Sequence, residues 1–239
     1  MTTVFTLPGA FSYGNMTTVQ GAFGGPQALL KQLGDNSTAN VVPVPYNDWD
    51  TLGGYIDGAA KLNAKLNALP AGEQVVALGH SFGSVALAQW LREYGPTSEI
   101  NPESITFVLA ANSIRPTNGL STILGLYEPA GPVSTKWKVA DAARQYDKWA
   151  DYPNNWSSPY YWPAYNNVNT GDNATGSVNG VPNNIHNSYE YVNLTDPTAA
   201  QTTIGTVTFL LFETEPPNLS GATRAEIETA YNRVVSPTW

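Results

Sequence analysis

The sequence predicts an α/β fold in which a mostly parallel sheet is covered by helices on both faces. Short β-forming runs alternate with segments whose apolar residues recur at helical spacing, which is the pattern of such folds. Apolar residues make up 42% of the chain and charged residues 13%, a balance that suits a packed core. A length of 239 residues is typical of one domain, so we expect a single domain over residues 1–239.

Strands are predicted where β-forming residues run between turn residues, as between Thr3 and Pro8-Gly9. The run 206–212 is apolar and strand-sized, which indicates a buried strand late in the chain. The predicted strands are Thr3–Leu7, Val41–Val44, Gln74–Gly79, Ile105–Ala110 and Thr203–Phe212, with Trp137–Ala140 as a further candidate.

Helices are predicted between these strands. The clearest covers Leu52–Leu69, where apolar residues including Leu52 and Ile56 recur at helical spacing until Pro70-Ala71-Gly72 ends the segment. The others are Gln27–Leu33, Ser84–Tyr94 and Arg224–Val235. Residues 151–192 show no sustained periodicity but are rich in Tyr and Trp, so we expect a long, ordered, loop-rich excursion in which these rings pack.

Composition excludes several functions. The net charge of −8 and the absence of any basic run argue against nucleic acid as a partner. With no cysteine, only two histidines and no H-E-x-x-H, the sequence predicts no metal site, and Gly21–Gly25 lacks the spacing of a dinucleotide turn, so no cofactor is expected. The sequence shows neither a signal peptide nor a bilayer-spanning run, which predicts a soluble protein.

The strongest motif is Gly79-His80-Ser81-Phe82-Gly83, a G-x-S-x-G pattern between a predicted strand and a predicted helix. In α/β-hydrolases this arrangement forms a sharp turn that exposes the serine hydroxyl, and the flanking glycines let strand and helix approach. In a glycine-rich chain the five letters alone also arise by chance. Their position between strand and helix favours Ser81 as a nucleophile.

A serine nucleophile needs a base, usually imidazole. His80 adjoins the serine and would point away from it, which leaves His186; an incidental surface histidine is the alternative. Because the base must be neutral, activity is expected to fall below about pH 6 to 7, the ordinary histidine range.

The third member of the triad should be a carboxylate between serine and histidine in the chain. Asp147 and Asp151 are the leading candidates, while Asp141 and Asp172 are weaker; most aspartates are simply solvated surface acids.

An oxyanion hole needs two hydrogen-bond donors. One is expected from the Phe82 amide, directly after the nucleophile. The second should come from the exit of the first strand, through the amide of Ala10 or Phe11 with help from the Ser12 hydroxyl, although an ordinary glycine turn would also explain this segment.

With these residues assigned, the chain resembles the PE-PPE-domain serine hydrolases of mycobacteria, which are relatives of cutinases. Four stretches in the family's order carry the resemblance: GHSFGS (79–84), ITFVLAANSIRP (105–116), ARQYDKWADYP (143–153) and HNSY (186–189). The resemblance implies an α/β-hydrolase fold, esterase or lipase activity, and a triad of Ser81, Asp147 and His186. It therefore favours Asp147 over Asp151. The chain departs from the family in lacking the accompanying N-terminal helical module, and from many cutinases in lacking their cysteines.

The sequence leaves three hypotheses about function: two that differ in the ester substrate and one that is not catalytic. The expected substrate is a small-molecule or lipid ester, with a cell-envelope lipid as one candidate; Leu124, Tyr127, Trp149 and Trp156 are predicted to wall an acyl site, or else merely to pack over the sheet. A mycolyl-arabinogalactan esterase of the lysin B type, which would imply a phage-encoded protein, is the alternative within the same class. A non-catalytic protein that binds cell wall or carbohydrate on a hydrolase fold is the alternative outside it.

Overall fold

The centre of the molecule is a seven-stranded sheet with the order β2-β1-β3-β4-β5-β9-β8. The computed structural model describes residues 1–116, 118–127, 135–169, 175–178, 181–204, 206–214, 219 and 221–232. All neighbouring strands in this sheet are parallel except β8 and β9, which form an antiparallel pair at one edge. The strands are β1 (Thr2–Leu7), β2 (Ala39–Pro43), β3 (Val75–His80), β4 (Ile105–Ala110), β5 (Lys138–Arg144), β8 (Ala200–Ile204) and β9 (Val207–Phe212).

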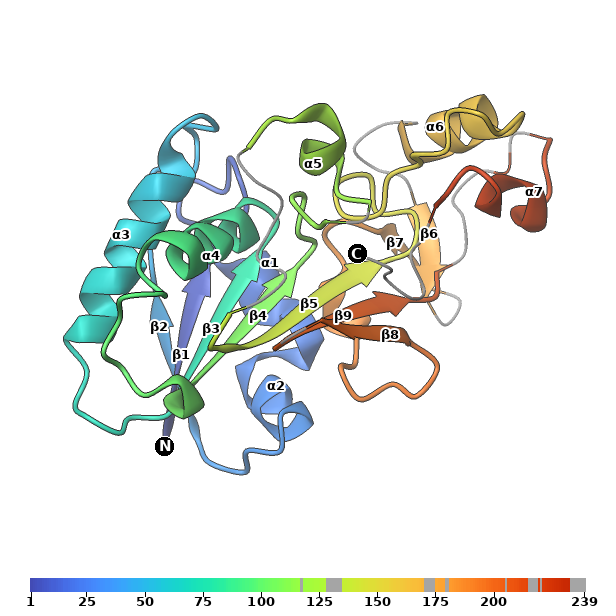
Figure 1. Ribbon diagram of the computed structural model, residues 1–239. Helices are drawn as coiled ribbons and strands as arrows, with labels where there is room; N and C mark the ends of the chain where they lie inside the picture. The colour runs from blue at the N-terminus through green and yellow to red at the C-terminus, as the bar shows by residue number, and fades with distance from the viewer. Residues whose placement is uncertain are drawn as a thin grey trace.

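Helices cover both faces of the sheet, as Figure 1 shows, with α3 and α4 on one face and α2 on the other. The α-helices are α1 (Thr17–Gly21), α2 (Pro26–Gln32), α3 (Gly54–Asn67), α4 (Phe82–Glu93), α5 (Leu120–Leu124), α6 (Tyr161–Asn169) and α7 (Arg224–Glu228). Three 3₁₀ segments, η1 (Ala22–Gly24), η2 (Pro102–Ser104) and η3 (Tyr189–Tyr191), lie between them, and β6 (Thr175–Val178) pairs with β7 (Val181–Asn184) in a separate hairpin. This architecture confirms the predicted α/β-hydrolase fold class.

The core follows from the alternation of side chains along the parallel strands. In β3, Val75 and Ala77 point into the cluster under α3 and α4, whereas Val76 and Leu78 point into the cluster under α1 and α2. Both sets are buried, since each face of the sheet is covered. A sheet buried on both faces explains why its strands read as apolar runs rather than as alternating ones.

The topology also indicates where a ligand would bind. The chain runs from β1 outward to β2 and then returns to β3 on the other side of β1, so the strand order reverses at the pair β1 and β3. In open parallel sheets, ligands bind outside the carboxyl ends of the strands at such a reversal. Ser81 follows the last residue of β3 and therefore lies at this position.

The structure corrects several predicted elements. The late strand 203–212 is two antiparallel strands, β8 and β9, and the excursion 151–192 contains α6 and the β6–β7 hairpin. Helix α3 begins at Gly54, and the side chains of Leu52 and Ile56 are exposed rather than on its buried face. Helix α7 is shorter than the predicted 224–235, whose last three residues lie outside the described part of the chain.

The aromatic excursion packs as expected where it is described. Tyr146, Tyr152 and Ile185 form a third buried cluster with residues of α6 and α7, including Ala164 and Ile227. Along the described residues, no helix combines the length and apolar character that a bilayer crossing requires.

Candidate active site

Ser81 occupies a strained turn between β3 and α4. Its backbone has φ +53° and ψ −117°, a conformation that side-chain-bearing residues rarely adopt. The two glycines of the motif make the turn possible, because a Cβ on Gly83 would lie 2.2 Å from the carbonyl oxygen of Leu7 and one on Gly79 would lie 2.6 Å from the backbone of Gly83. The buried Ser84 hydroxyl lies within hydrogen-bond distance of the carbonyls of Gly79 and Ala110, which ties the turn to the sheet.

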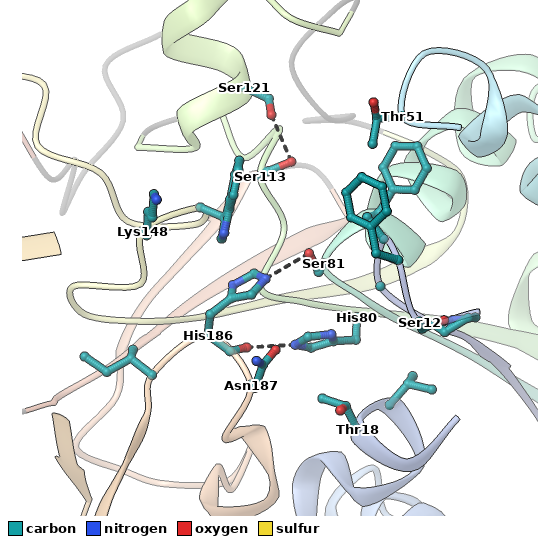
Figure 2. Close-up of a pocket in the computed structure, with 18 of the residues that line it drawn as sticks. Ser12, Thr18, Thr51, His80, Ser81, Ser113, Ser121, Lys148, His186 and Asn187 are labelled. Carbon is teal, nitrogen blue, oxygen red and sulfur yellow. Dashed lines mark hydrogen bonds between the residues drawn. The ribbon is translucent and has the colours of Figure 1, made fainter. Parts of the chain in front are cut away.

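The structure brings Ser81, His186 and Asp147 into one hydrogen-bonded line. His186 Nε2 lies 2.9 Å from Ser81 Oγ, and His186 Nδ1 lies 2.9 Å from Asp147 Oδ1 (the first of these bonds is drawn in Figure 2). Ser81 follows β3 and Asp147 follows β5, whereas His186 lies in a turn after β7. The three residues thus come from separate segments and meet at the carboxyl edge of the sheet.

Asp147 is fully buried, and its surroundings keep it ionised. Burial alone would raise the pKa of this carboxyl, but the charge and hydrogen bond of His186, the Trp149 amide and the Tyr189 hydroxyl outweigh burial and lower it to about 2. An ionised carboxylate only accepts hydrogen bonds, so Nδ1 of His186 carries the proton and donates it to Asp147. In the neutral ring Nε2 is then the acceptor, and it faces the Ser81 hydroxyl.

The other predicted carboxylates lie elsewhere. Asp151 is buried and accepts from the Tyr146 amide and from Asn118, while Asp141 lies beside Asn112 and Arg115. The structure therefore places Asp147, and not Asp151 or Asp141, against His186. Asp172 lies outside the described residues.

The predicted oxyanion donors require a correction. The Phe11 amide donates to the carbonyl of Asp48 at 3.0 Å, and the Ser12 hydroxyl bonds to the Asp48 carboxylate. Both are engaged away from the nucleophile, so neither serves as the second donor in this arrangement. Among the described residues nothing accepts a hydrogen bond from the amide of Ala10 or of Phe82, and both residues line the pocket around Ser81.

A pocket of about 550 Å³ opens over Ser81 and His186. Phe82 and Tyr127 form part of its wall, with ring centroids 6.0 Å apart, and Tyr55 packs behind Phe82 at 6.1 Å without lining the pocket. Polar side chains also line the pocket: Thr51, and Ser113 and Ser121, whose hydroxyls are bonded to each other at 3.0 Å (Figure 2). The pocket therefore combines apolar and polar walls around the hydroxyl of Ser81.

Of the predicted wall residues, two line the pocket and two do not. Tyr127 and Trp149 lie in its wall, and the Trp149 ring is 6.2 Å from the ring of His186. Leu124 ends the short helix α5 with its side chain 55% exposed, and Trp156 is 63% exposed and stacks on Tyr161. Neither lines the pocket.

Sequence reasoning missed the residues that support the triad. The buried Tyr189 hydroxyl donates to Asp147 Oδ2 at 2.9 Å and accepts from the Arg144 amide at 3.1 Å. The Arg144 guanidinium donates to the carbonyls of Ile185 and Ser188, on either side of His186. Tyr189 and Arg144 stand in the stretches HNSY and ARQYDKWADYP, but nothing in the sequence gave either a role.

Comparison with solved structures finds distant likenesses. A cutinase-like protein from Cryptococcus sp. matches with a TM-score of 0.47 and 19% identity over 63% of this chain and 79% of that one. A metagenomic carboxyl esterase matches with a TM-score of 0.41 and 11% identity over 98% of this chain and 72% of that one. Both likenesses are too distant to say what this chain does.

A search of curated proteins finds no match. A family model described as the PE-PPE domain matches residues 36–213, a range that contains Ser81, Asp147 and His186. Because this range is well over half of the 239 residues, the chain belongs to the PE-PPE domain family.

Proposed function

We propose that this protein is a serine hydrolase that cleaves carboxylic esters through an acyl-enzyme. The observation that carries the proposal is the line of 2.9 Å contacts from Ser81 to His186 and from His186 to Asp147, at the foot of an open pocket. A nucleophile bonded to a base, with the base oriented by a carboxylate, is the arrangement that acyl transfer requires. Family membership agrees with it.

In the proposed reaction, Ser81 Oγ attacks the ester carbonyl carbon while its proton passes to His186 Nε2. Asp147 holds the imidazole in the required tautomer and stabilises the imidazolium. The Phe82 amide at the first turn of the 12-residue helix α4, with the Ala10 amide, stabilises the negative charge on the carbonyl oxygen. His186 then protonates the departing alcohol, and water, activated by the same imidazole, releases the acid.

The walls of the pocket favour an ester with an apolar acyl group. Phe82, Tyr127 and Trp149 offer aromatic surface beside the nucleophile, and Phe11 and Leu126 line the pocket with more than half of each side chain exposed. Covering exposed apolar side chains with apolar ligand surface removes both from water, and this burial favours binding. We therefore propose small-molecule or lipid esters as the substrate class.

The test is hydrolysis of p-nitrophenyl esters of increasing acyl length. Wild-type protein should hydrolyse them, Ser81→Ala should lose the activity, and Ser157→Ala, at an exposed site outside the pocket, should keep it. A rate that rises from two-carbon to medium chains supports the acyl wall, whereas a flat or falling rate contradicts it.

Folded protein with no activity on any ester would instead favour the binding protein on a hydrolase fold. A mycolyl-arabinogalactan ester, the substrate of the lysin B alternative, stays a prediction that direct assay on that ester would test.

A further inference from the structure

The turn that carries His186 is fastened to the sheet by a second histidine. His80, the last residue of β3 and the neighbour of Ser81, places its Nε2 2.8 Å from the backbone carbonyl oxygen of His186 (Figure 2). A carbonyl only accepts hydrogen bonds, so Nε2 of His80 carries the proton and donates it. Only 3% of His80 is exposed, and water competes little for this bond.

The rest of the turn is held in the same way from β5. Arg144, the last residue of that strand, donates through Nη1 to the carbonyls of Ile185 at 3.2 Å and Ser188 at 3.0 Å. Three carbonyls of residues 185–188 thus accept from side chains at the ends of two strands. These strands, β3 and β5, also lead into Ser81 and Asp147. The nucleophile, the carboxylate and the turn that carries His186 are therefore all attached to the ends of strands of the same sheet.

These hydrogen bonds to the backbone matter because His186 lies in a turn. Residues 185–187 belong to no helix or strand, yet the ring must keep two contacts of 2.9 Å at once. A misplacement of about 1 Å at a reacting group can cost about 100-fold in rate. The contact of His186 Nε2 changes partner during the reaction, whereas the contact of Nδ1 with Asp147 persists. A contact to the His186 backbone holds the turn itself while Nε2 changes partner.

His80 is suited to this task because it stays neutral. Burial, together with the smaller effect of the neighbouring His186, lowers the pKa of His80 to about 4. The two rings lie 5.2 Å apart between centroids, and Tyr189 packs edge-on against His80 at 5.8 Å. A neutral donor holds the carbonyl without placing a second positive charge next to the imidazolium that forms on His186 during catalysis.

We propose that His80 is a positioning residue for His186, acting through the hydrogen bond from its Nε2 to the His186 carbonyl. The inference rests on the proposed serine hydrolase activity. It assigns to the first variable position of G-x-S-x-G a function that is separate from both the nucleophile and the base.

Three substitutions of His80 test this hydrogen bond. In His80→Gln the side-chain amide nitrogen is four bonds from Cα, as Nε2 of histidine is, and can donate to the same carbonyl. In His80→Asn the nitrogen is one bond short, and in His80→Phe the ring remains without a donor. We expect kcat for p-nitrophenyl esters to fall by about 10- to 100-fold in the Asn and Phe variants with KM changed by less than about threefold, and Gln to restore kcat to within about fivefold of wild type.

Equal kcat in the Gln and Asn variants, or wild-type kcat in folded His80→Phe, would overturn the proposal. A second readout requires no variant: in ¹⁵N-histidine NMR spectra of the wild-type protein, His80 should be neutral at pH 7 with its proton on Nε2. A proton on Nδ1 would overturn the proposal even if every variant failed to fold. Since the NMR measurement does not depend on ester cleavage, an inactive wild type with the expected His80 tautomer would reject the proposed function alone.

Discussion

Tyr189→Phe removes a buried hydroxyl that hydrogen-bonds to Asp147 of the proposed triad. The substitution takes one hydrogen bond from Asp147 Oδ2 and one from the Arg144 amide. The Tyr189 hydroxyl donates to Asp147 Oδ2 and accepts from the Arg144 amide, and its side chain is fully buried. A hydrogen bond to a charged group contributes about 1.5–3 kcal/mol, and a buried donor without an acceptor costs about 1–3 kcal/mol. Together these effects predict a loss of about 3–5 kcal/mol in the free energy of unfolding.

The assay is urea denaturation at pH 7, with Tyr191→Phe as the matched control. Tyr191 lies in the same 3₁₀ segment, but its side chain is 47% exposed, so its variant should stay within about 0.5 kcal/mol of wild type. Ester hydrolysis should persist in Tyr189→Phe with kcat reduced by no more than about tenfold, because the remaining donors still keep the pKa of Asp147 well below 7. If Tyr189→Phe unfolds at the same urea concentration as the control, the hydroxyl does not support Asp147 and the reasoning is refuted.

Three further predictions follow from the site. Asp147→Asn should lower kcat by about 10⁴-fold, because the amide can favour the wrong tautomer of His186; stopped-flow or steady-state kinetics showing less than a tenfold loss would contradict that orientation. The folded protein should lose about 3 kcal/mol of stability between pH 6.5 and pH 4, because burial lowers the pKa of His80 to about 4 and the unfolded chain binds its proton first; urea midpoints across this range should fall in wild type and fall less in His80→Gln, and parallel slopes would reject this origin. Gly83→Ala should destabilise by at least about 3 kcal/mol since its Cβ would meet the Leu7 carbonyl, whereas Gly21→Ala, with open space around it, should not; equal melting temperatures would contradict the packing of the turn.

Local patterns made much of this site predictable. The strand-to-helix turn at Ser81 is encoded within five residues, because glycines two positions to either side allow the backbone contacts that the turn requires. His186 could be assigned because the chain has only two histidines and the other one adjoins the serine. In both cases the residue types favoured one assignment over its alternative, which was a chance motif for Ser81 and an incidental surface histidine for His186.

Long-range partners limited the remaining predictions. Phe11 could not be excluded as an oxyanion donor from its own segment, because its amide bonds to Asp48, which lies 37 positions further along the chain. Asp147 and Asp151 lie in one short stretch, and the residue pattern alone left both as candidates. The family resemblance favoured Asp147, and the folded chain places Asp147 against His186 and Asp151 against Asn118. The exposure of Leu124 and Trp156 likewise depends on elements that meet only in the folded protein.

The central claim, that Ser81 is a nucleophile activated by His186, is tested most directly by covalent labelling. Wild-type protein incubated with a fluorophosphonate probe should gain one adduct, and peptide mass spectrometry should locate it on Ser81. His186→Ala should label far more slowly, and Ser81→Ala not at all. Folded wild-type protein that stays unlabelled, or an adduct on any other serine, would contradict the claim.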